Sequence, residues 1–120
     1  MPIFVIHHHF ASHEHFDLRL EMDNVLRSWA VPKEPPRKTG IKRLAVQVSD
    51  HAVSYAKFKG TIPKGNYGAG KVEIWDKGTY KVLEQDKKKI VFELKGKRLK
   101  GMYVLVNFRE RNWLLFKKKV

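Results

Sequence analysis

The segment His15-Phe16-Asp17-Leu18-Arg19-Leu20-Glu21-Met22 alternates strictly between polar and apolar side chains. Every second residue from Phe16 to Met22 is apolar, and a period of two is typical of a β-strand with one buried face. The opposite face is unusual, because it carries an imidazole, a carboxylate and a guanidinium in successive positions on the same side. The segment therefore predicts a β-strand that presents reactive groups along one face.

Three side chains near the start of the chain form a candidate metal site. His9 precedes His15, and we expect the non-alternating residues between them to loop back and bring the two rings together. Two imidazoles and the carboxylate of Asp17 suit a divalent metal and leave coordination positions open. Arg19 beside them suits a phosphate, because its planar fork matches two phosphate oxygens. The other histidines of this region are expected to be structural or exposed: His7, His8 and His13.

The composition bounds the kind of protein. A chain of 120 residues with 42% hydrophobic residues supports one compact domain over residues 1–120. No apolar run approaches the ~20 residues needed to cross a bilayer, and the first residues do not resemble a signal peptide. The count of 0 cysteines excludes a disulfide framework, a thiolate zinc site and a cysteine nucleophile. We therefore expect a cytoplasmic, monomeric protein without a membrane partner.

Positive charge is the strongest global signal. The chain has 25 Lys and Arg against 12 Asp and Glu, a net charge of +13. Such an excess favours a polyanionic partner, most commonly a nucleic acid. A lysine-rich surface like that of thermophile proteins explains this excess of positive charge less well, because the ion-pair networks of such surfaces need acids in similar number. The basic connections expected to hold duplex phosphates are residues 37–43, 87–89 and 95–100.

The rest of the chain has the pattern of short strands separated by turns. The strands are expected at residues 2–6, 25–31, 44–48, 58–62, 71–75, 79–83, 90–94, 102–108 and 113–116. Asp23-Asn24 and Asp76-Lys77-Gly78 are turn signals, and the glycines of residues 63–70 predict a structural turn with positive φ angles. No segment has the period of a long helix. The chain thus predicts an all-β fold, a small antiparallel barrel or strongly curled sheet of about eight to ten strands.

Three further polar residues lie where strands end. Lys33 follows the strand at 25–31 in a proline-rich loop, and loops commonly carry functional side chains. His51 lies at the exit of the strand at 44–48, and Tyr55 follows it in the next connection. On position alone, each of the three is equally well explained as a solvated or packing residue.

Several motifs share their order and spacing with one known family. They are His9 to Ala11, His15 to Glu21, Leu26 to Lys33, Lys42 to Val48, Asp50-His51, Tyr55, Gly60 to Pro63, Gly65 to Gly70, Ile74 to Gly78, Phe92 to Leu94 with Gly96, Leu99 and Gly101, and Trp113 to Leu115. In these motifs the chain resembles the 3′-phosphoesterase module at the N-terminus of bacterial DNA ligase D, which also occurs as a small stand-alone protein in archaea. The resemblance covers nearly the whole chain, so it is far more specific than any single motif.

The resemblance implies a manganese-dependent hydrolase that processes 3′ ends in DNA repair by non-homologous end joining. Members of this family remove a terminal ribonucleoside from a primer-template strand as phosphodiesterases. They then remove the remaining phosphate as phosphomonoesterases, which leaves a 3′-OH. The implied cofactor is Mn²⁺ or another divalent transition metal, and the implied fold is a small crescent-like β-barrel. The implied partners are DNA or DNA/RNA primer-template 3′ ends, together with a DNA ligase and a polymerase.

The resemblance also implies roles by position. The residues that match the family's metal ligands are His9, His15 and Asp17. Those that match its essential active-site residues are Arg19, His51 and Tyr55, and those that match its phosphate-end residues are Lys33 and Arg43. We expect Arg19 and His51 to lie against the scissile phosphate, with His51 also able to act as a general acid. Tyr55 is expected to orient His51 or the phosphate.

Two departures from the family concern the phosphate-removing step. Ser49 stands two positions before His51, where the family usually has an acidic residue. The chain is also expected to lack the N-terminal extension that assists the monoesterase step in the ligase-fused modules. We therefore expect the nucleoside to be removed more efficiently than the phosphate.

Two other functions fit parts of the sequence. His15 and Asp17 with the distal His51 imitate the triad of non-haem iron oxygenases, although the span to His51 is short for their larger barrels. A non-catalytic basic β-barrel that binds nucleic acid, similar to an OB-fold, would fit the charge. Its stacking surfaces would come from Trp29, Tyr67, Trp75 and Trp113. Such a binder, however, has no need of histidines, a carboxylate and an arginine in one place.

Overall fold

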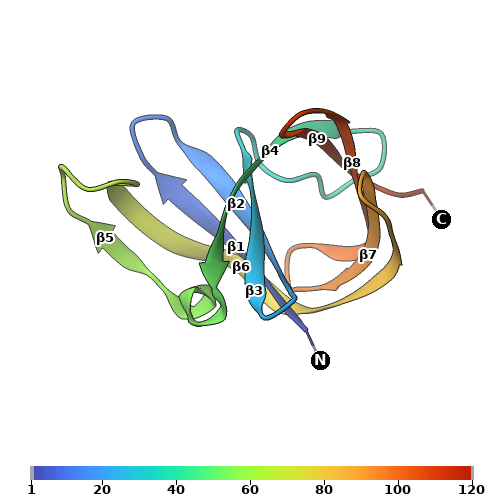
Figure 1. Cartoon of the computed structure of the whole chain (residues 1–120), viewed down its shortest axis with the longest axis horizontal. Coiled ribbons are helices and arrows are strands. Elements are labelled where there is room, and N and C mark those ends of the chain that lie inside the picture. Colours follow the sequence, from blue (N-terminus) through green and yellow to red (C-terminus); the bar gives the residue numbers. More distant parts are fainter. Residues whose placement is uncertain (1, 120) are drawn as a thin grey trace.

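The computed structural model describes residues 2–119, which form β-strands and one short 3₁₀ helix. These elements are β1 (Ile3–Phe10), β2 (His15–Met22), β3 (Val25–Val31), β4 (Lys42–Ala52), η1 (Val53–Lys57), β5 (Gly60–Ile62), β6 (Gly70–Gln85), β7 (Lys89–Lys95), β8 (Lys100–Arg109) and β9 (Asn112–Lys117). Figure 1 shows β5 at one end of the long axis and β7 towards the other. Among the described residues, no helix is long and apolar enough to cross a membrane.

The strands close into one antiparallel barrel, which confirms the predicted fold class. The sheet order is β1-β2-β3-β4-β9-β8-β7-β6-β5, and β1 also pairs with β6. Because of that second pairing, eight strands form the closed wall, while β5 is an additional strand on β6. Long-range antiparallel pairing of this kind removes sheet edges from most of the molecule.

The barrel core is built from the apolar positions of the alternating strands. Phe4 and Ile6 of β1 pack with Leu18 and Leu20 of β2 in the main core cluster, and Trp29 is fully buried among them. The opposite face of β1 contributes Val5 to a second, smaller cluster with Leu26 and Ala56. The outer face of β1 and β2 is therefore covered too, because η1 packs over part of it.

This second cover explains why the charged face of β2 is not solvated. Asp17 and Arg19 are each only 4% exposed, although they alternate with core residues. A polar face that is buried in this way must find partners within the protein, since an unpaired buried charge is costly. The alternation therefore predicts the strand correctly, but it does not predict that the polar side chains of this strand are buried.

The residues around His9 are more regular than the sequence analysis predicts. The first strand does not end near residue 6: β1 continues to Phe10, and His9 lies directly opposite His15 in the β1–β2 pairing. The expected loop back is confirmed, because residues 11–14 reverse the chain and bring the rings of His9 and His15 to 4.9 Å from each other. Only the predicted end of the first strand is wrong, and the longer β1 holds His9 in the ladder with β2.

The predicted hairpin at residues 76–78 is also wrong, because β6 runs without interruption from Gly70 to Gln85. Gly78 lacks a positive φ angle, and a Cβ added to it would lie 2.1 Å from the carbonyl oxygen of Lys95. Gly78 therefore permits the close approach of another backbone segment, which is a common reason for a glycine inside a strand. Asp76 does not form a turn either; its buried carboxylate accepts backbone N–H groups from Lys97 to Leu99.

Two turn predictions are confirmed. Asp23 and Asn24 both have positive φ angles, 55° and 66°, as a two-residue hairpin turn requires. In the loop before β6, positive φ angles occur at Gly65, Gly68 and Gly70. A Cβ added to Gly70 would lie 2.4 Å from the carbonyl oxygen of Phe10, so this glycine allows the loop to approach the end of β1.

Candidate functional site

A pocket of about 420 Å³ lies beside the paired ends of β1 and β2. Its lining combines His9, His15 and Asp17 with Arg19, and it includes His51 and Tyr55 from the end of β4 and from η1. A further wall comes from the glycine-rich loop, through Tyr67 and Gly68. The structure thus brings together the residues that the sequence predicts as metal ligands and as essential active-site residues.

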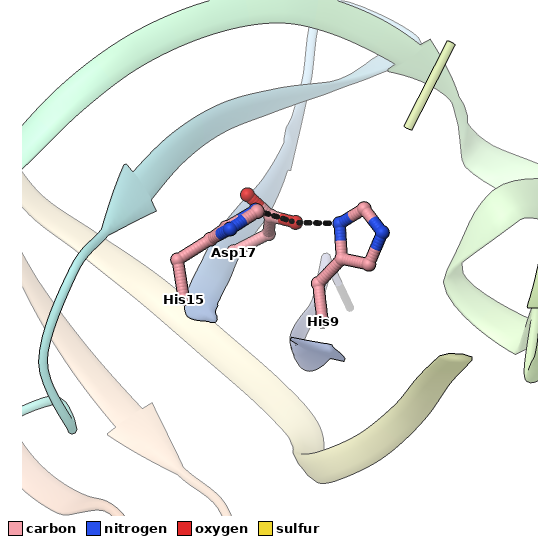
Figure 2. A group of neighbouring side chains, drawn as sticks. All are labelled: His9, His15 and Asp17. Carbon is pink, nitrogen blue, oxygen red and sulfur yellow. Dashed lines mark ion pairs between the residues drawn. The ribbon is translucent and has the colours of Figure 1, made fainter. Parts of the chain in front are cut away.

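His9, His15 and Asp17 form a compact cluster (Figure 2). Oδ2 of Asp17 lies 3.2 Å from Nε2 of His15 and 3.8 Å from Nδ1 of His9. One ligand atom from each residue lies within 4.8 Å of the other two. These are nitrogen and oxygen donors of the kind that divalent transition metals prefer.

Backbone carbonyls orient both rings of the cluster. Nε2 of His9 donates to the carbonyl oxygen of Gly68 at 2.8 Å, and Nδ1 of His15 donates to that of His13 at 2.9 Å. In the neutral rings, Nδ1 of His9 and Nε2 of His15 then carry lone pairs, and these are the atoms that face Asp17. Three electron-pair donors that face one another need a cation or a proton between them. Carbonyl acceptors behind the ligands are also typical of metal-bound histidines, so the donor set fits a divalent cation.

The protonation of the cluster follows from the same geometry. The hydrogen bond with Asp17 raises the pKa of His15, against the lowering effect of burial. Burial by itself would raise the pKa of Asp17, but the hydrogen bond from His15 and the positive charge of Arg19 outweigh it and lower that pKa. Asp17 is therefore an ionised carboxylate, and its negative charge favours a proton or a cation between it and His15.

Arg19 is held by side chains from four different positions in the chain. Nε donates to Nδ1 of His7 at 3.0 Å, and Nη2 donates to Oδ2 of Asp17 at 3.3 Å. Nη1 donates to Oγ of Ser28 at 2.9 Å and lies 3.1 Å from Nδ1 of His51. A guanidinium has five N–H groups, so these contacts use four of them. Among the described residues none accepts the fifth, on Nη2, which is available to a ligand in the pocket that Arg19 lines.

His51 and Tyr55 line the same pocket as His9, His15 and Asp17, which together are called the metal-type cluster. Burial and the charge of Arg19 lower the pKa of His51, so its ring is neutral at neutral pH. Nδ1 of His51 lies 3.1 Å from Nη1 of Arg19, which can only donate, and 3.2 Å from the carbonyl oxygen of Ser49, which can only accept. Nδ1 accepts from Arg19 in the tautomer with the proton on Nε2 and donates to Ser49 in the other tautomer. The Tyr55 ring lies 4.7 Å from that of His51, and the Arg19 guanidinium lies 5.0 Å from the Tyr55 centroid. Tyr55 therefore packs against both groups, in agreement with an orienting role.

The sequence analysis missed two residues of this site, His7 and Ser28. His7 is fully buried; burial and the charge of Arg19 lower its pKa to about 4, which keeps it a neutral acceptor for Arg19. Its Nε2 donates to the carbonyl oxygen of Phe58 at 3.0 Å. Both residues had a signal in the sequence: His7 alternates with His9, and the two-residue turn at 23–24 places Ser28 directly opposite Arg19.

Lys33 and Arg43 lie outside the pocket lining. Arg43 is eight residues from His51 along β4, roughly 26 Å in an extended strand. Its Nε donates to the carbonyl oxygen of Glu34 at 2.9 Å, so it is tied to the loop that contains Lys33. Among the described residues that line the pocket, Arg19 is the only arginine and lysines are absent. Phosphate binding by Lys33 and Arg43 stays a prediction, and it would concern a part of the strand outside the pocket.

The predicted iron triad of His15, Asp17 and His51 is not the set that the structure gathers. The third member of the cluster is His9, whereas Nδ1 of His51 is engaged by Arg19. The donor types alone would also suit iron, but an arginine buried beside the cluster is better explained by an anionic substrate.

Comparison with known proteins gives a consistent family. A family model described as the DNA ligase D 3′-phosphoesterase domain matches residues 7–107. The multifunctional non-homologous end joining DNA repair protein LigD of Mycobacterium tuberculosis is 44% identical over 120 residues, which cover 97% of this chain and 16% of that protein. The LigD protein of Pseudomonas aeruginosa is 44% identical over 125 residues, which cover 97% of this chain and 15% of that protein. The chain thus spans about one sixth of the length of these relatives.

Proposed function

This chain belongs to the DNA ligase D 3′-phosphoesterase domain family, and from that membership we propose that it removes blocking groups from the 3′ ends of DNA strands. The membership makes it a phosphoesterase, a hydrolase that cleaves phosphate esters. The finer proposal is a two-step reaction: release of a 3′-terminal ribonucleoside, then release of the remaining phosphate to leave a 3′-OH. The relatives are named for non-homologous end joining, so we propose that pathway as the setting, with a ligase and a polymerase as partners.

The cofactor that we propose is a divalent transition metal, preferably Mn²⁺, held by His9, His15 and Asp17. When bound, such an ion supplies a Lewis acid beside the phosphoryl group and lowers the pKa of water. The proposal is supported by the position of the Asp17 carboxylate, whose Oδ2 lies 3.2 Å from Nε2 of His15 and 3.8 Å from Nδ1 of His9. The chain's own residues must then bind the phosphate, orient it and stabilise the charge that develops on it.

Arg19 is the residue that we assign to the phosphate itself. Its guanidinium is positioned by His7, Ser28, Asp17 and His51, so little conformational entropy remains to be lost when substrate binds. The remaining N–H on Nη2 lies on the nitrogen next to the metal-type cluster. A donor that is fixed before the reaction stabilises developing negative charge without reorganisation. This buried, pre-positioned arginine beside a two-histidine, one-carboxylate set is the observation that carries the proposal.

We assign His51 a second hydrogen bond to the phosphate. In the tautomer in which Nδ1 accepts from Arg19, the proton on Nε2 is left for an oxygen in the pocket, and this is the tautomer that we assign to the substrate complex. Since its pKa is lowered, the ring is neutral at neutral pH and acts there as a hydrogen-bond donor rather than as a general acid. Tyr55 holds the ring in place through the packing described above.

The proposed reaction is tested with a 5′-labelled primer-template whose primer ends in one ribonucleotide. With Mn²⁺ added, the wild-type chain should shorten the primer by one nucleoside and then remove the terminal phosphate; without a divalent metal, neither product should form. Asp17→Asn should abolish both steps, whereas the exposed Asp86→Asn should match the wild type. A wild-type chain that leaves the primer intact at all metal concentrations would refute the proposed activity.

The same time course tests the weaker second step. Ser49 lines the pocket two residues before His51, so its position lacks the carboxylate that the family usually has there. We expect primers that end in a 3′-phosphate to accumulate before the 3′-OH product appears. Ser49→Glu should shorten that lag if the missing carboxylate is the cause.

A further inference from the structure

Tyr67 differs from the other aromatic residues that the sequence analysis considers as stacking surfaces. Trp29 and Trp113 are buried in the core at 0% and 3% exposure. Trp75 is partly buried, and its ring is covered by the guanidinium groups of Arg37 and Arg98 at 5.3 and 4.9 Å. Tyr67 is 98% exposed, yet it lines the pocket that holds Arg19 and His51. A large aromatic ring in water at the rim of the proposed phosphate site has both faces free to receive a planar group.

The backbone that carries Tyr67 is well anchored, although its side chain is almost fully exposed. The N–H of Asn66 donates to the carbonyl oxygen of Pro63, and that of Ala69 donates to the carbonyl oxygen of Asn66. The carbonyl oxygen of Gly68, the next residue, accepts the 2.8 Å hydrogen bond from His9. The peptide that follows Gly68 is therefore fixed to the His9 ring, and this constrains the position of the adjacent Tyr67 relative to the metal-type cluster.

The loop also differs from a simple structural turn. Its glycines at 65, 68 and 70 have positive φ angles, and Gly70 allows the close approach to Phe10. These glycines account for the backbone path but not for an exposed tyrosine in its middle. A purely structural turn would be served as well by a small polar residue, which avoids the cost of apolar surface in water.

We propose that Tyr67 is a stacking platform for a nucleobase that flanks the scissile phosphate. This inference rests on the proposed function and adds to it the group that positions the strand end. Base–aromatic stacking tolerates every base, which suits an enzyme that must accept ends of any sequence. Loss of one such contact typically weakens binding about 5- to 150-fold. The base belongs either to the terminal nucleoside or to the penultimate nucleotide, and the two are separated by the test.

The test uses primer-templates that carry 2-aminopurine at the terminal or at the penultimate position, mixed with protein without added metal so that no cleavage occurs. Stacking quenches 2-aminopurine fluorescence. We expect the wild type and Tyr67→Phe to quench one of the two probes on binding. Tyr67→Ala should lose that quenching and bind the strand about 5- to 150-fold more weakly. The control is Phe108→Ala, since this 55%-exposed aromatic lies outside the pocket and should leave both signals unchanged.

An abasic site completes the design. Removal of the base at the position that is quenched should make Tyr67→Ala and the wild type bind equally well. Equal quenching and equal affinity for Tyr67→Ala and the wild type on the intact strands would overturn the inference, even if wild-type cleavage with Mn²⁺ is normal. Normal quenching with no cleavage by the wild type would instead refute the proposed function and leave the stacking platform in place.

Discussion

Nη1 of Arg19 lies 3.1 Å from Nδ1 of His51, which joins the middle of β2 to the far end of β4. The two residues are 32 positions apart in the sequence, and this contact closes the pocket between the metal-type cluster and η1. The contact with Arg19 favours the His51 tautomer that carries its proton on Nε2, whereas the carbonyl oxygen of Ser49, 3.2 Å from Nδ1, favours the other tautomer. One hydrogen bond thus positions both groups that we assign to the phosphate.

The first prediction concerns the shape of Arg19 rather than its charge. Arg19→Lys keeps a positive charge, but a lysine cannot donate at once to His7, Ser28, His51 and Asp17. We expect turnover to fall about 100-fold or more, the usual loss for one fixed donor in an active site. Single-turnover rates on the ribonucleotide-ended primer measure this loss. Arg111→Lys, at an exposed position, is the matched control, and wild-type rates for Arg19→Lys would exclude a role for the guanidinium fork.

The second prediction is a pH profile set by His51. Burial and the charge of Arg19 hold its pKa below the usual 6.5, so the ring is neutral above that pH. As pH falls towards the lowered pKa, both ring nitrogens carry protons, and Nδ1 can then no longer accept a hydrogen bond from Arg19. At saturating Mn²⁺, kcat should therefore be level from about pH 7 to 8 and should fall on the acid side.

His51→Gln retains an N–H donor without the titration. We expect it to keep part of the activity and to show a weaker acid limb. A wild-type rate that rises as the pH is lowered from neutral would contradict the neutral-donor role and would favour general-acid catalysis instead.

Much of this architecture was predictable from residue patterns, for physical reasons. The alternation from His15 to Met22 indicates a strand, and the Asp23-Asn24 turn fixes its register with β3. The failures came where one residue type serves two purposes. Gly78 resembles a turn glycine but permits a close backbone approach, so the long strand β6 was divided in two.

Only part of the site could be predicted from the sequence, for a related reason. His9, His15 and Asp17 are close in sequence, and pattern alone identified them. His51 and Tyr55 come from elements that meet the pocket through tertiary packing, so only the family resemblance singled them out. Arg19 is buried in part by Tyr55 of η1, a short helix that no periodicity in the sequence predicted. Hydrogen bonds from one arginine to several distant partners are therefore beyond what strand patterns can predict.

The third prediction concerns stability away from the site. The buried carboxylate of Asp76 accepts backbone N–H groups of Lys77, Lys97, Arg98 and Leu99, and so shapes the turn between β7 and β8. Asp76→Ala leaves these donors without their acceptor and should lower the free energy of unfolding by about 2–4 kcal/mol.

Urea denaturation measures this loss. Asp86→Ala, which removes an exposed acceptor of one N–H group, should cost less than about 1 kcal/mol. Activity per folded molecule should be unchanged in both variants. An Asp76→Ala chain as stable as the wild type would mean that the turn does not depend on the carboxylate.

The fourth prediction follows from the net charge of +13. Binding of a duplex primer-template should weaken steeply between about 50 and 200 mM salt, because neutralised phosphates release counterions. A variant with the substitutions Lys95→Gln, Lys97→Gln and Lys100→Gln should show a smaller slope of affinity against salt, while its single-turnover rate at saturating protein stays the same. Fluorescence anisotropy at several salt concentrations measures the slope. Salt-independent affinity would show that the basic segments do not contact the strand.

The fifth prediction addresses the cation site. Titration with Mn²⁺, followed by the electron paramagnetic resonance of the free ion, should show one tightly bound ion per wild-type chain. His15→Ala and Asp17→Asn should weaken Mn²⁺ binding strongly. Removal of a group that only supports a metal ligand costs about 10- to 100-fold in affinity, and removal of a ligand itself should cost more. His13→Ala should bind as the wild type does, because this exposed residue contributes only its backbone carbonyl. Equal Mn²⁺ affinity in all four chains would contradict a cation held by His9, His15 and Asp17 beside Arg19.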